Sequence, residues 1–140
     1  MRISSIIFLF LTFMSSAACQ AGNENQTFKD FWSEFRTSIL SDDYEKLNNL
    51  VQLPLEVRGV HDDIPAEFFS AEQLKEITPK LLDQTIFLYE QDDLKETTFR
   101  EIIKNMKTAD IQPDKSSHRI EQFEFQVVKG RWLLVRAYLE

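Results

Sequence analysis

The 140-residue sequence has few of the residues that form disulfides, tight turns or metal sites: one cysteine, three glycines, four prolines and two histidines. A single cysteine cannot form an intramolecular disulfide, so a hydrophobic core must hold the fold. The sequence also lacks a glycine-rich phosphate-binding loop, a Gly-x-Ser-x-Gly elbow and a His-x-x-x-His pair. Such motifs mark nucleotide-binding, serine-hydrolase and zinc sites. We therefore expect no cofactor and no metal ion.

Positive charge is also scarce. Sixteen Lys and Arg residues stand against 23 Asp and Glu residues, and removal of residues 1–18 would leave 15 against 23. Proteins bind nucleic acids largely through Lys and Arg side chains that displace counterions from the phosphates. We therefore expect no nucleic-acid partner. The about 120 residues that remain suit one acidic domain, residues 27–140.

Long apolar runs are missing as well, because the most apolar run, Ile6 to Phe13, is far shorter than the about 20 residues that cross a bilayer. Arg2 precedes this run, and the small residues Ser15 to Ala18 follow it. A basic start, a short apolar run and small residues form the pattern of a secretory signal peptide. The sequence thus predicts a signal peptide over residues 1–18 and export to the periplasm.

The single cysteine, Cys19, directly follows this segment. Residues 15–19, Ser-Ser-Ala-Ala-Cys, resemble the lipobox of bacterial lipoproteins, which implies acyl chains on Cys19 and no other membrane attachment. They depart from that motif at Ser16, where leucine is usual. An ordinary signal-peptidase cut explains the same residues, so both alternatives stay open. A lipidated form, with Gln20 after the cysteine, would be sorted to the outer membrane and face the periplasm on a polar tether, residues 19–26.

The first ordered element is predicted to be a helix that begins after Thr27. Thr27 and Asp30 form a variant capping box, and apolar side chains then recur at helical spacing as far as Leu40. We expect Trp32 and Phe35, on the apolar face of this helix, to be buried against a sheet.

The next elements are a short helix and a strand. Asp42 or Asp43 is suited to cap the short helix. Residues 53–59, Leu-Pro-Leu-Glu-Val-Arg-Gly, then predict a strand, and Pro54 favours a strand start or a sheet edge because proline donates no ladder hydrogen bond.

The charged middle of the chain predicts three further short helices. A Ser-x-x-Gln capping box covers residues 70–73, and the Thr78-Pro79 pair has the residues of an N-cap and a first helical position. An Asp-x-x-Glu pattern over residues 93–96 predicts the third start. That helix would carry the apolar residues Phe99, Ile102, Ile103 and Met106.

The C-terminal residues predict a β-hairpin whose turn is Lys129-Gly130. If the turn has two residues, Phe125 faces Leu134 across the hairpin and Phe123 faces Arg136. One face of the hairpin then carries an aromatic set with one arginine: Phe123, Phe125, Val127, Trp132, Leu134, Arg136 and Tyr138.

Residues 28–59 and 119–139 together resemble small exported bacterial proteins with a nuclear transport factor 2-like cone. The resemblance rests on the apolar pattern of these segments and on Pro54, Leu55 and Gly59. It implies an α+β fold, in which N-terminal helices pack on a curved antiparallel sheet with a concave pocket. The superfamily includes isomerases, dehydratases and non-catalytic members, so the resemblance speaks to fold and leaves chemistry open.

Arg136 is the most prominent candidate for a site, because it is a charge in an otherwise apolar strand. In a cone it could bind an anion beside Trp132, Tyr138 and Phe125. The alternative is a structural ion pair with Glu121, which lies diagonally across the predicted hairpin.

Other polar residues are weaker candidates. The consecutive residues His61, Asp62 and Asp63 rarely converge on one ion, and His118 stands alone beside a loop. Residues 90–96, Glu-Gln-Asp-Asp-Leu-Lys-Glu, are interpreted as a solvated turn and helix start rather than a calcium loop.

These features lead to two expectations for function. The first is a non-enzymatic exported domain that binds a partner protein or a small apolar ligand at the cell envelope. An immunity-type inhibitor of a secreted toxin is one form of it, because an acidic surface suits a basic partner. The second is a small isomerase or hydrolase, which requires that at least two of a set of polar residues share one cavity. That set is Arg136, Glu121, Tyr138, Tyr89 and His118.

Overall fold

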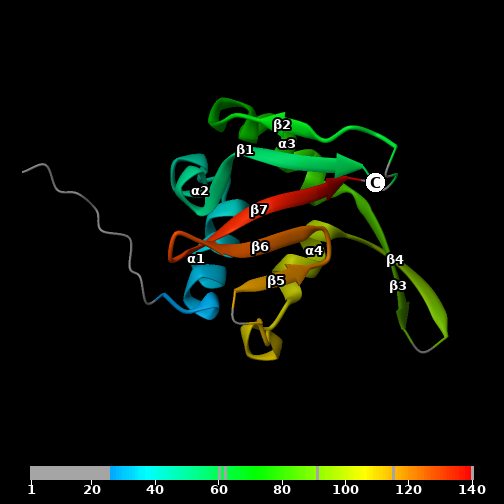
Figure 1. The fold of residues 1–140 in the computed structure, drawn as a ribbon. Helices are drawn as coiled ribbons and strands as arrows, with labels where there is room; N and C mark the ends of the chain where they lie inside the picture. The colour runs from blue at the N-terminus through cyan, green and yellow to red at the C-terminus, as the bar shows by residue number, and fades with distance from the viewer. Residues whose placement is uncertain (1–25, 60, 62, 91, 115, 140) are drawn as a thin grey trace, which may run out of the picture.

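The computed structural model describes residues 26–59, 61, 63–90, 92–114 and 116–139. Within these residues the fold is α+β, as predicted, with four α-helices, a five-stranded sheet and a separate two-stranded hairpin (Figure 1). The predicted signal peptide, Cys19 and most of the predicted tether lie outside the described residues.

The two N-terminal helices begin where the capping patterns place them. Helix α1 spans Phe28–Leu40, and the Thr27 hydroxyl accepts a hydrogen bond from the Asp30 backbone N–H at 3.2 Å. Helix α2 spans Tyr44–Leu50, and the side chain of Asp43 accepts from the Lys46 N–H at 3.2 Å. Side-chain acceptors of this kind satisfy backbone donors that have no partner within the helix.

The large sheet has the strand order β2-β1-β7-β6-β5. Neighbouring strands are antiparallel except for β1 and β7, which run parallel, so the sheet is mixed rather than wholly antiparallel as the resemblance implied. The helices lie behind one face, and the other face is turned toward the viewer in Figure 1. The strand bounds are β1 Val51–Gly59, β2 Glu67–Phe69, β5 Ser117–Ile120, β6 Phe123–Val128 and β7 Arg131–Leu139.

Strand β1 differs from the prediction made from Pro54. The proline lies inside the strand, after a cis peptide bond from Leu53, and β1 is an interior strand of the sheet. The proline is tolerated because the pairing of β1 with β7 is irregular between Val51 and Glu56. The missing N–H of Pro54 therefore falls where the ladder is interrupted.

The C-terminal hairpin has the predicted turn. Lys129 and Gly130 both have positive φ angles, 50° and 80°, which suit a two-residue hairpin turn. Near the turn the predicted register is confirmed, since Phe125 pairs with Leu134.

Farther from the turn the predicted register is wrong. An irregularity between Glu124 and Phe125 shifts the pairing, so that Phe123 faces Ala137 and Glu124 faces Arg136. An extra residue in one strand reverses the faces of all side chains beyond it. Arg136 and Tyr138 therefore lie on the sheet face opposite Phe123 and Phe125.

The middle of the chain forms fewer helices than predicted. The capping box at Ser70 is confirmed, because its N–H donates to Gln73 Oε1 at 2.9 Å, and it opens a short 3₁₀ turn, η1 (Ala71–Gln73). Helix α3 follows directly as Leu74–Asp83, so Thr78 and Pro79 lie inside one helix and do not start a new one. The continuous helix is stabilised by an apolar face that spans the proline: Leu74, Ile77, Leu81 and Leu82.

The predicted helix start at residues 93–96 is also wrong. Strand β4 (Asp93–Thr98) occupies this segment and pairs with β3 (Thr85–Glu90), which forms a hairpin that projects from the body of the fold (Figure 1). Helix α4 starts later, as Phe99–Asn105, where the Thr98 hydroxyl accepts from the Glu101 N–H at 3.3 Å. A second 3₁₀ turn, η2 (Thr108–Asp110), precedes β5.

The core lies between α1 and the sheet. Trp32 and Phe35 of α1 are fully buried, as predicted, and their rings lie 5.9 Å and 5.1 Å from the ring of Phe125 on β6. Phe99 of α4 and Phe123 of β6 close the core at the other end with ring centroids 4.7 Å apart. Tilted and edge-to-face contacts at these distances are favourable for aromatic rings.

Candidate functional site

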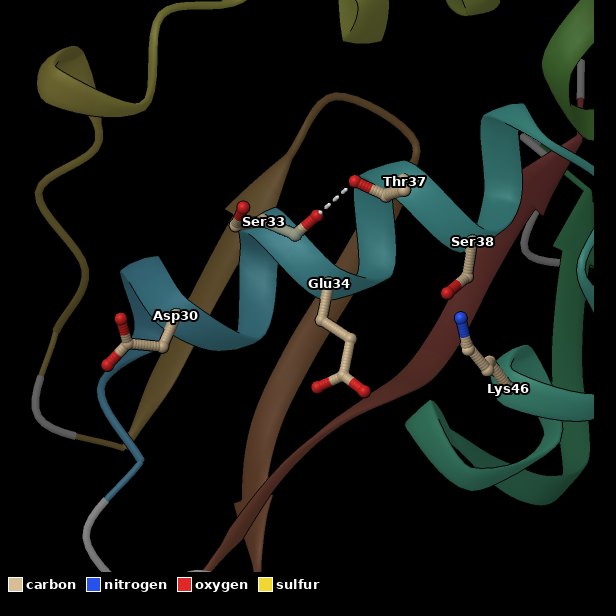
Figure 2. A pocket seen from close by; sticks show the side chains of 6 residues that line it. All are labelled: Asp30, Ser33, Glu34, Thr37, Ser38 and Lys46. Atoms are coloured by element: carbon tan, nitrogen blue, oxygen red, sulfur yellow. Dashed lines mark hydrogen bonds between the residues drawn. The ribbon is translucent and has the colours of Figure 1, made fainter.

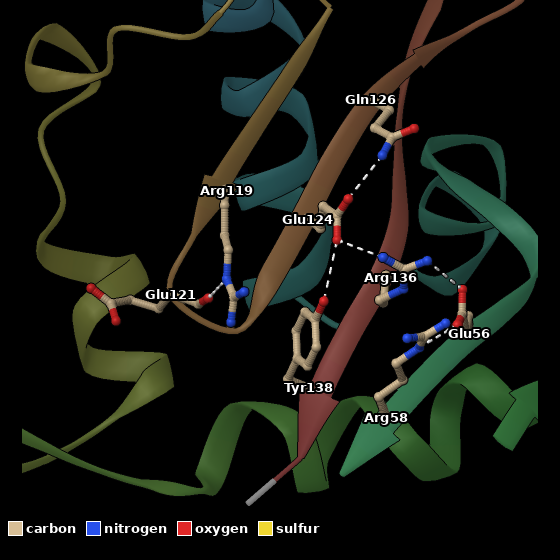
Figure 3. A network of polar contacts seen from close by, with 8 residues as sticks. All are labelled: Glu56, Arg58, Arg119, Glu121, Glu124, Gln126, Arg136 and Tyr138. Atoms are coloured by element: carbon tan, nitrogen blue, oxygen red, sulfur yellow. Dashed lines mark hydrogen bonds and ion pairs between the residues drawn. The ribbon is translucent and has the colours of Figure 1, made fainter. Parts of the chain in front are cut away.

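Arg136 lies at the centre of a polar network on the outer face of the large sheet (Figure 3). Its Nη1 donates to Glu124 Oε2 at 2.9 Å and its Nη2 donates to Glu56 Oε2 at 3.0 Å. The predicted ion pair with Glu121 is therefore wrong, although a structural pairing with carboxylates is present. The cause is the register shift in β6 and β7, which places Glu124 directly opposite Arg136.

The network follows one row of paired positions across the five strands. Phe68 of β2 pairs with Glu56 of β1, which pairs with Arg136 of β7. Glu124 of β6 comes next, and Arg119 of β5 ends the row. Directly opposite side chains on one face of a sheet are within contact distance, so the alternation of acid and base along the row stabilises the sheet.

Two charges of this row, Glu56 and Arg136, hold each other in the ionised state. The hydrogen bond from Arg136 lowers the pKa of Glu56, and Arg58, whose Nε donates to Glu56 Oε1 at 2.5 Å, lowers it further. In turn the hydrogen bond to Glu56 raises the pKa of Arg136. An anionic ligand at Arg136 would have to displace two carboxylates that already accept from the guanidinium.

Tyr138 extends the same network along β7. Its hydroxyl donates to Glu124 Oε2 at 3.3 Å, and the guanidinium carbon of Arg119 lies 4.3 Å from the centre of its ring. The stacked guanidinium and ring form a cation–π contact. Arg136 and Tyr138 are thus brought together as predicted, but on the outer face of the sheet and not in an aromatic pocket.

The other predicted ligand-binding residues lie elsewhere. Phe125 is fully buried and Trp132 is 7% exposed, and both belong to the core on the opposite face of the sheet. Glu121 is exposed in the turn between β5 and β6, where its backbone carbonyl accepts from Arg119 Nε at 2.9 Å. The five predicted ligand-binding residues therefore lie in three places: the outer face of the sheet, the core and the β5–β6 turn. The register shift is what separates Arg136 and Tyr138 from the core residues.

One small cavity brings two of the predicted polar residues together. It measures about 210 Å³, and its lining residues are Met106, Ile111, His118, Arg119, Ile120 and Glu121. Burial lowers the pKa of His118, and the ring packs edge-on against Phe28 with centroids 4.9 Å apart. No hydrogen bond joins His118 to Glu121 among the described residues, so the two side chains share a cavity without forming a hydrogen-bonded pair.

A second hollow lies on the polar side of α1 and measures about 370 Å³ (Figure 2). One of its hydroxyls is engaged within the helix, since Thr37 Oγ1 donates to the Ser33 carbonyl at 2.8 Å. Lys46, which reaches in from α2, forms an ion pair with Asp43 at 3.3 Å. Among the described residues no hydroxyl of this groove is hydrogen-bonded to a carboxylate or to an amine.

A third cavity, of about 340 Å³, lies between the end of β1, strand β2 and α3. Its walls are mainly apolar, with Val57, Phe69 and Ile77 among them, and Lys80 and Glu67 add opposite charges. It has more apolar lining residues than the other two hollows, which suits a small apolar ligand.

The β3–β4 hairpin carries an exposed apolar surface that the sequence did not predict. Phe87 is 58% exposed, Tyr89 is 82% exposed and Leu94 is 56% exposed. Tyr89 pairs directly with Leu94, and Phe87 lies two residues along the same strand, so the three side chains share one face. We call these three residues the hairpin patch. The only signal in the sequence is the run Ile86 to Tyr89, which is apolar at every position and so needs cover on both faces.

Of the segment 90–96, which was predicted to be a solvated turn and helix start, residues 90 and 92–96 are exposed, and residue 91 lies outside the described residues. Residues 93–96 belong to β4 and do not start a helix. In the described part of the chain no three His, Cys, Asp or Glu side chains are placed to hold a metal ion, and His61 and Asp63 are exposed. Likewise, no described helix has the length and apolar character needed to span a bilayer.

Comparison of the chain with protein-family models, with curated proteins and with solved structures gives no match in any of the three. The resemblance to the nuclear transport factor 2-like cone stays a prediction. The function is therefore argued from the geometry of the chain itself.

Proposed function

We propose that this chain is an exported, non-enzymatic domain that binds a partner protein at the cell envelope. The observation that carries the proposal is the hairpin patch, in which three large apolar side chains lie exposed on one face of a projecting hairpin. Contiguous apolar patches on soluble domains mark interaction sites, and aromatic residues are enriched in them. The apolar run of residues 6–13, with its flanking residues, supports export.

The shape of the patch favours a protein over a small molecule. Small-molecule sites are concave and enclose most of the ligand, whereas the hairpin patch lies on the open face of two strands. The acidic composition adds long-range attraction for a basic partner. An immunity-type inhibitor of a secreted toxin is one form that such a domain could take.

A pull-down from envelope extracts tests the proposal. The domain of residues 27–140 is immobilised and exposed to extract at low and at high salt. We expect a protein to be retained at low salt and to be reduced at high salt, because charge attraction is screened by ions. Recovery of no specific protein under either condition would contradict protein binding.

The small-enzyme alternative is supported by one observation, the cavity shared by His118 and Glu121. A His whose pKa is lowered by burial is neutral near pH 7 and accepts a proton, as a general base must. A panel of ester, amide and isomerisation substrates, tested on the parent and on His118→Gln, addresses this alternative. Turnover that the variant lacks would favour the enzyme, and no turnover by the parent would count against it.

A further inference from the structure

We infer that the hairpin patch is the docking surface for a partner protein that presents an apolar centre surrounded by Lys and Arg side chains. The inference rests on the proposed function and names the surface and the chemistry of its partner. Three groups of observations carry it: the exposure of the patch, the cover on the opposite face of the hairpin, and the acidic residues around the tip.

The two faces of the hairpin have different environments. On the inner face Ile86 is only 6% exposed and Leu88 packs against the core, so the base of the hairpin is fixed to the body of the fold. Glu90 and Lys95, nearer the tip on the same face, are exposed. The outer face carries Phe87, Tyr89 and Leu94, and each of these side chains is more than half exposed. The patch thus lies on a paired hairpin that is anchored at its base, which reduces the ordering that binding requires.

Acidic side chains lie on both faces of the hairpin that carries the patch. Glu90, Asp92, Asp93 and Glu96 stand against Lys95 as the one basic residue of the tip. Lys95 is paired with Glu90 at 3.4 Å, whereas the other three carboxylates are exposed and form no ion pair with a described residue. Glu96 lies directly opposite Phe87 on the patch face itself. Asp93 pairs with Glu90, one position along from the Tyr89–Leu94 pair, so its side chain lies on the inner face of the hairpin. A basic rim on the partner would complement Glu96 and Asp92.

The same charges argue against other occupants. A symmetric dimer of two hairpin patches would bury the Glu96 carboxylates of both copies in one interface, and like charges at an interface are unfavourable. Anionic lipid headgroups would meet the same carboxylates, although apolar and aromatic side chains alone are suited to a membrane interface. A partner protein of positive charge is the occupant that satisfies both the apolar face and the acidic rim.

The chain offers a matched control for the test. Phe68 of β2 is 61% exposed, which is close to the 58% of Phe87, but it lies on the outer face of the large sheet. Glu76 of α3 is an exposed carboxylate away from the hairpin. Phe68→Ser and Glu76→Gln therefore remove the same kinds of groups without touching the proposed surface.

The experiment begins with a benzophenone amino acid placed at position 89 or at position 68, followed by irradiation in the detergent-solubilised envelope protein fraction. A protein that crosslinks at position 89 and not at position 68 is identified by mass spectrometry, purified and titrated calorimetrically. We expect Tyr89→Ser and Leu94→Ser each to weaken its binding about tenfold or more, as is usual for central interface residues. Glu96→Gln should weaken binding and its salt dependence, and both control variants should bind like the parent.

Each other outcome overturns a specific claim. A partner that binds all hairpin variants like the parent leaves protein binding intact and removes this surface. No crosslink at position 89, when the pull-down does retain a protein, removes this surface and leaves protein binding intact. Retention of no protein in the pull-down removes the proposed function together with the inference. Self-association of the parent in sedimentation velocity that Tyr89→Ser abolishes would assign the patch to a second copy. Binding of the parent to phosphatidylglycerol vesicles that Tyr89→Ser abolishes would assign it to a membrane.

Discussion

Replacement of Phe125 by alanine tests whether this residue belongs to the core, as the structure shows, or to a ligand pocket, as the sequence predicted. Phe125 has no exposed surface and is surrounded by rings of α1 and β6. The ring centroids within contact distance are Phe35 at 5.1 Å, Phe28 at 5.6 Å, Phe31 at 5.6 Å, Trp32 at 5.9 Å and Phe123 at 6.2 Å.

The expected cost follows from this environment. Truncation of a buried Phe to Ala typically lowers the free energy of unfolding by about 3–5 kcal/mol, and five neighbouring rings favour the upper part of that range. For a domain of this size 1 kcal/mol corresponds to about 4 °C in the melting temperature, so Phe125→Ala should melt roughly 12–20 °C below the parent. Tyr89→Ala, at a residue 82% exposed, should change stability by about 0.5 kcal/mol or less.

Thermal unfolding followed by far-ultraviolet circular dichroism measures both variants against the parent. If Phe125→Ala does not fold, Phe125→Leu keeps most of the volume and should still melt several degrees below the parent. Equal and small shifts for Phe125→Ala and Tyr89→Ala would refute the placement of Phe125 in the core and would reopen its role in a pocket.

Three further predictions concern the first helix, the network and the cysteine. Trp32→Ala should lower the melting temperature by many degrees whereas Glu34→Ala should leave it nearly unchanged, because Trp32 is fully buried and Glu34 is exposed. Since the hydrogen bond from Arg136 lowers the pKa of Glu56 in the folded protein, the unfolded chain takes up its proton first as the pH falls. The stabilisation is fully present above the ordinary glutamate pKa and is lost as the pH falls through the lowered pKa of the folded protein, so Glu56→Gln should flatten the acid side of a pH series of urea unfolding. Cys19→Ala should abolish acyl mass and detergent partitioning if Cys19 is lipidated, and intact mass spectrometry of the mature protein decides this.

Each of these three predictions has an outcome that would contradict it. Comparable effects of Trp32→Ala and Glu34→Ala would contradict the assigned helix face. An acid profile of Glu56→Gln that matches the parent would show that the pair with Arg136 contributes no pH dependence. An unmodified mass that begins at or after Cys19 would exclude the lipid anchor.

The N-terminal helices could be predicted because their signals are local. The hydroxyl of Thr27 and the carboxylate of Asp43 each cap the helix that follows within three residues, and the apolar spacing of α1 matches the helical repeat. The Lys129-Gly130 turn could be predicted for the same reason, since a two-residue turn depends on the conformations of its own residues.

The position of Arg136 could not be predicted, because it depends on an irregularity between two strands. Leu133, Leu134 and Val135 are all apolar, so the sequence of β7 has no alternation that would reveal on which face each residue lies. A shift of one residue then moved Arg136 from the predicted aromatic face to the outer face, beside Glu124.

The hairpin patch was missed for a related reason. Strand β4 was predicted as a helix start from its Asp-x-x-Glu pattern, and its pairing with β3 depends on a partner strand that a local capping pattern does not consider. In β3, Ile86 to Tyr89 are apolar at successive positions, so only the packing of Ile86 and Leu88 against the body leaves Phe87 and Tyr89 exposed.

The most direct test of protein binding through the hairpin patch is a map of amide chemical shifts in the ¹⁵N-labelled domain as the purified partner is added. We predict that the largest changes fall on Phe87, Tyr89 and Leu94 and their neighbours in β3 and β4. The amides around His118 and Glu121 should move little. The largest changes around His118 and Glu121, with the hairpin unperturbed, would contradict this account and place the binding site at the small cavity.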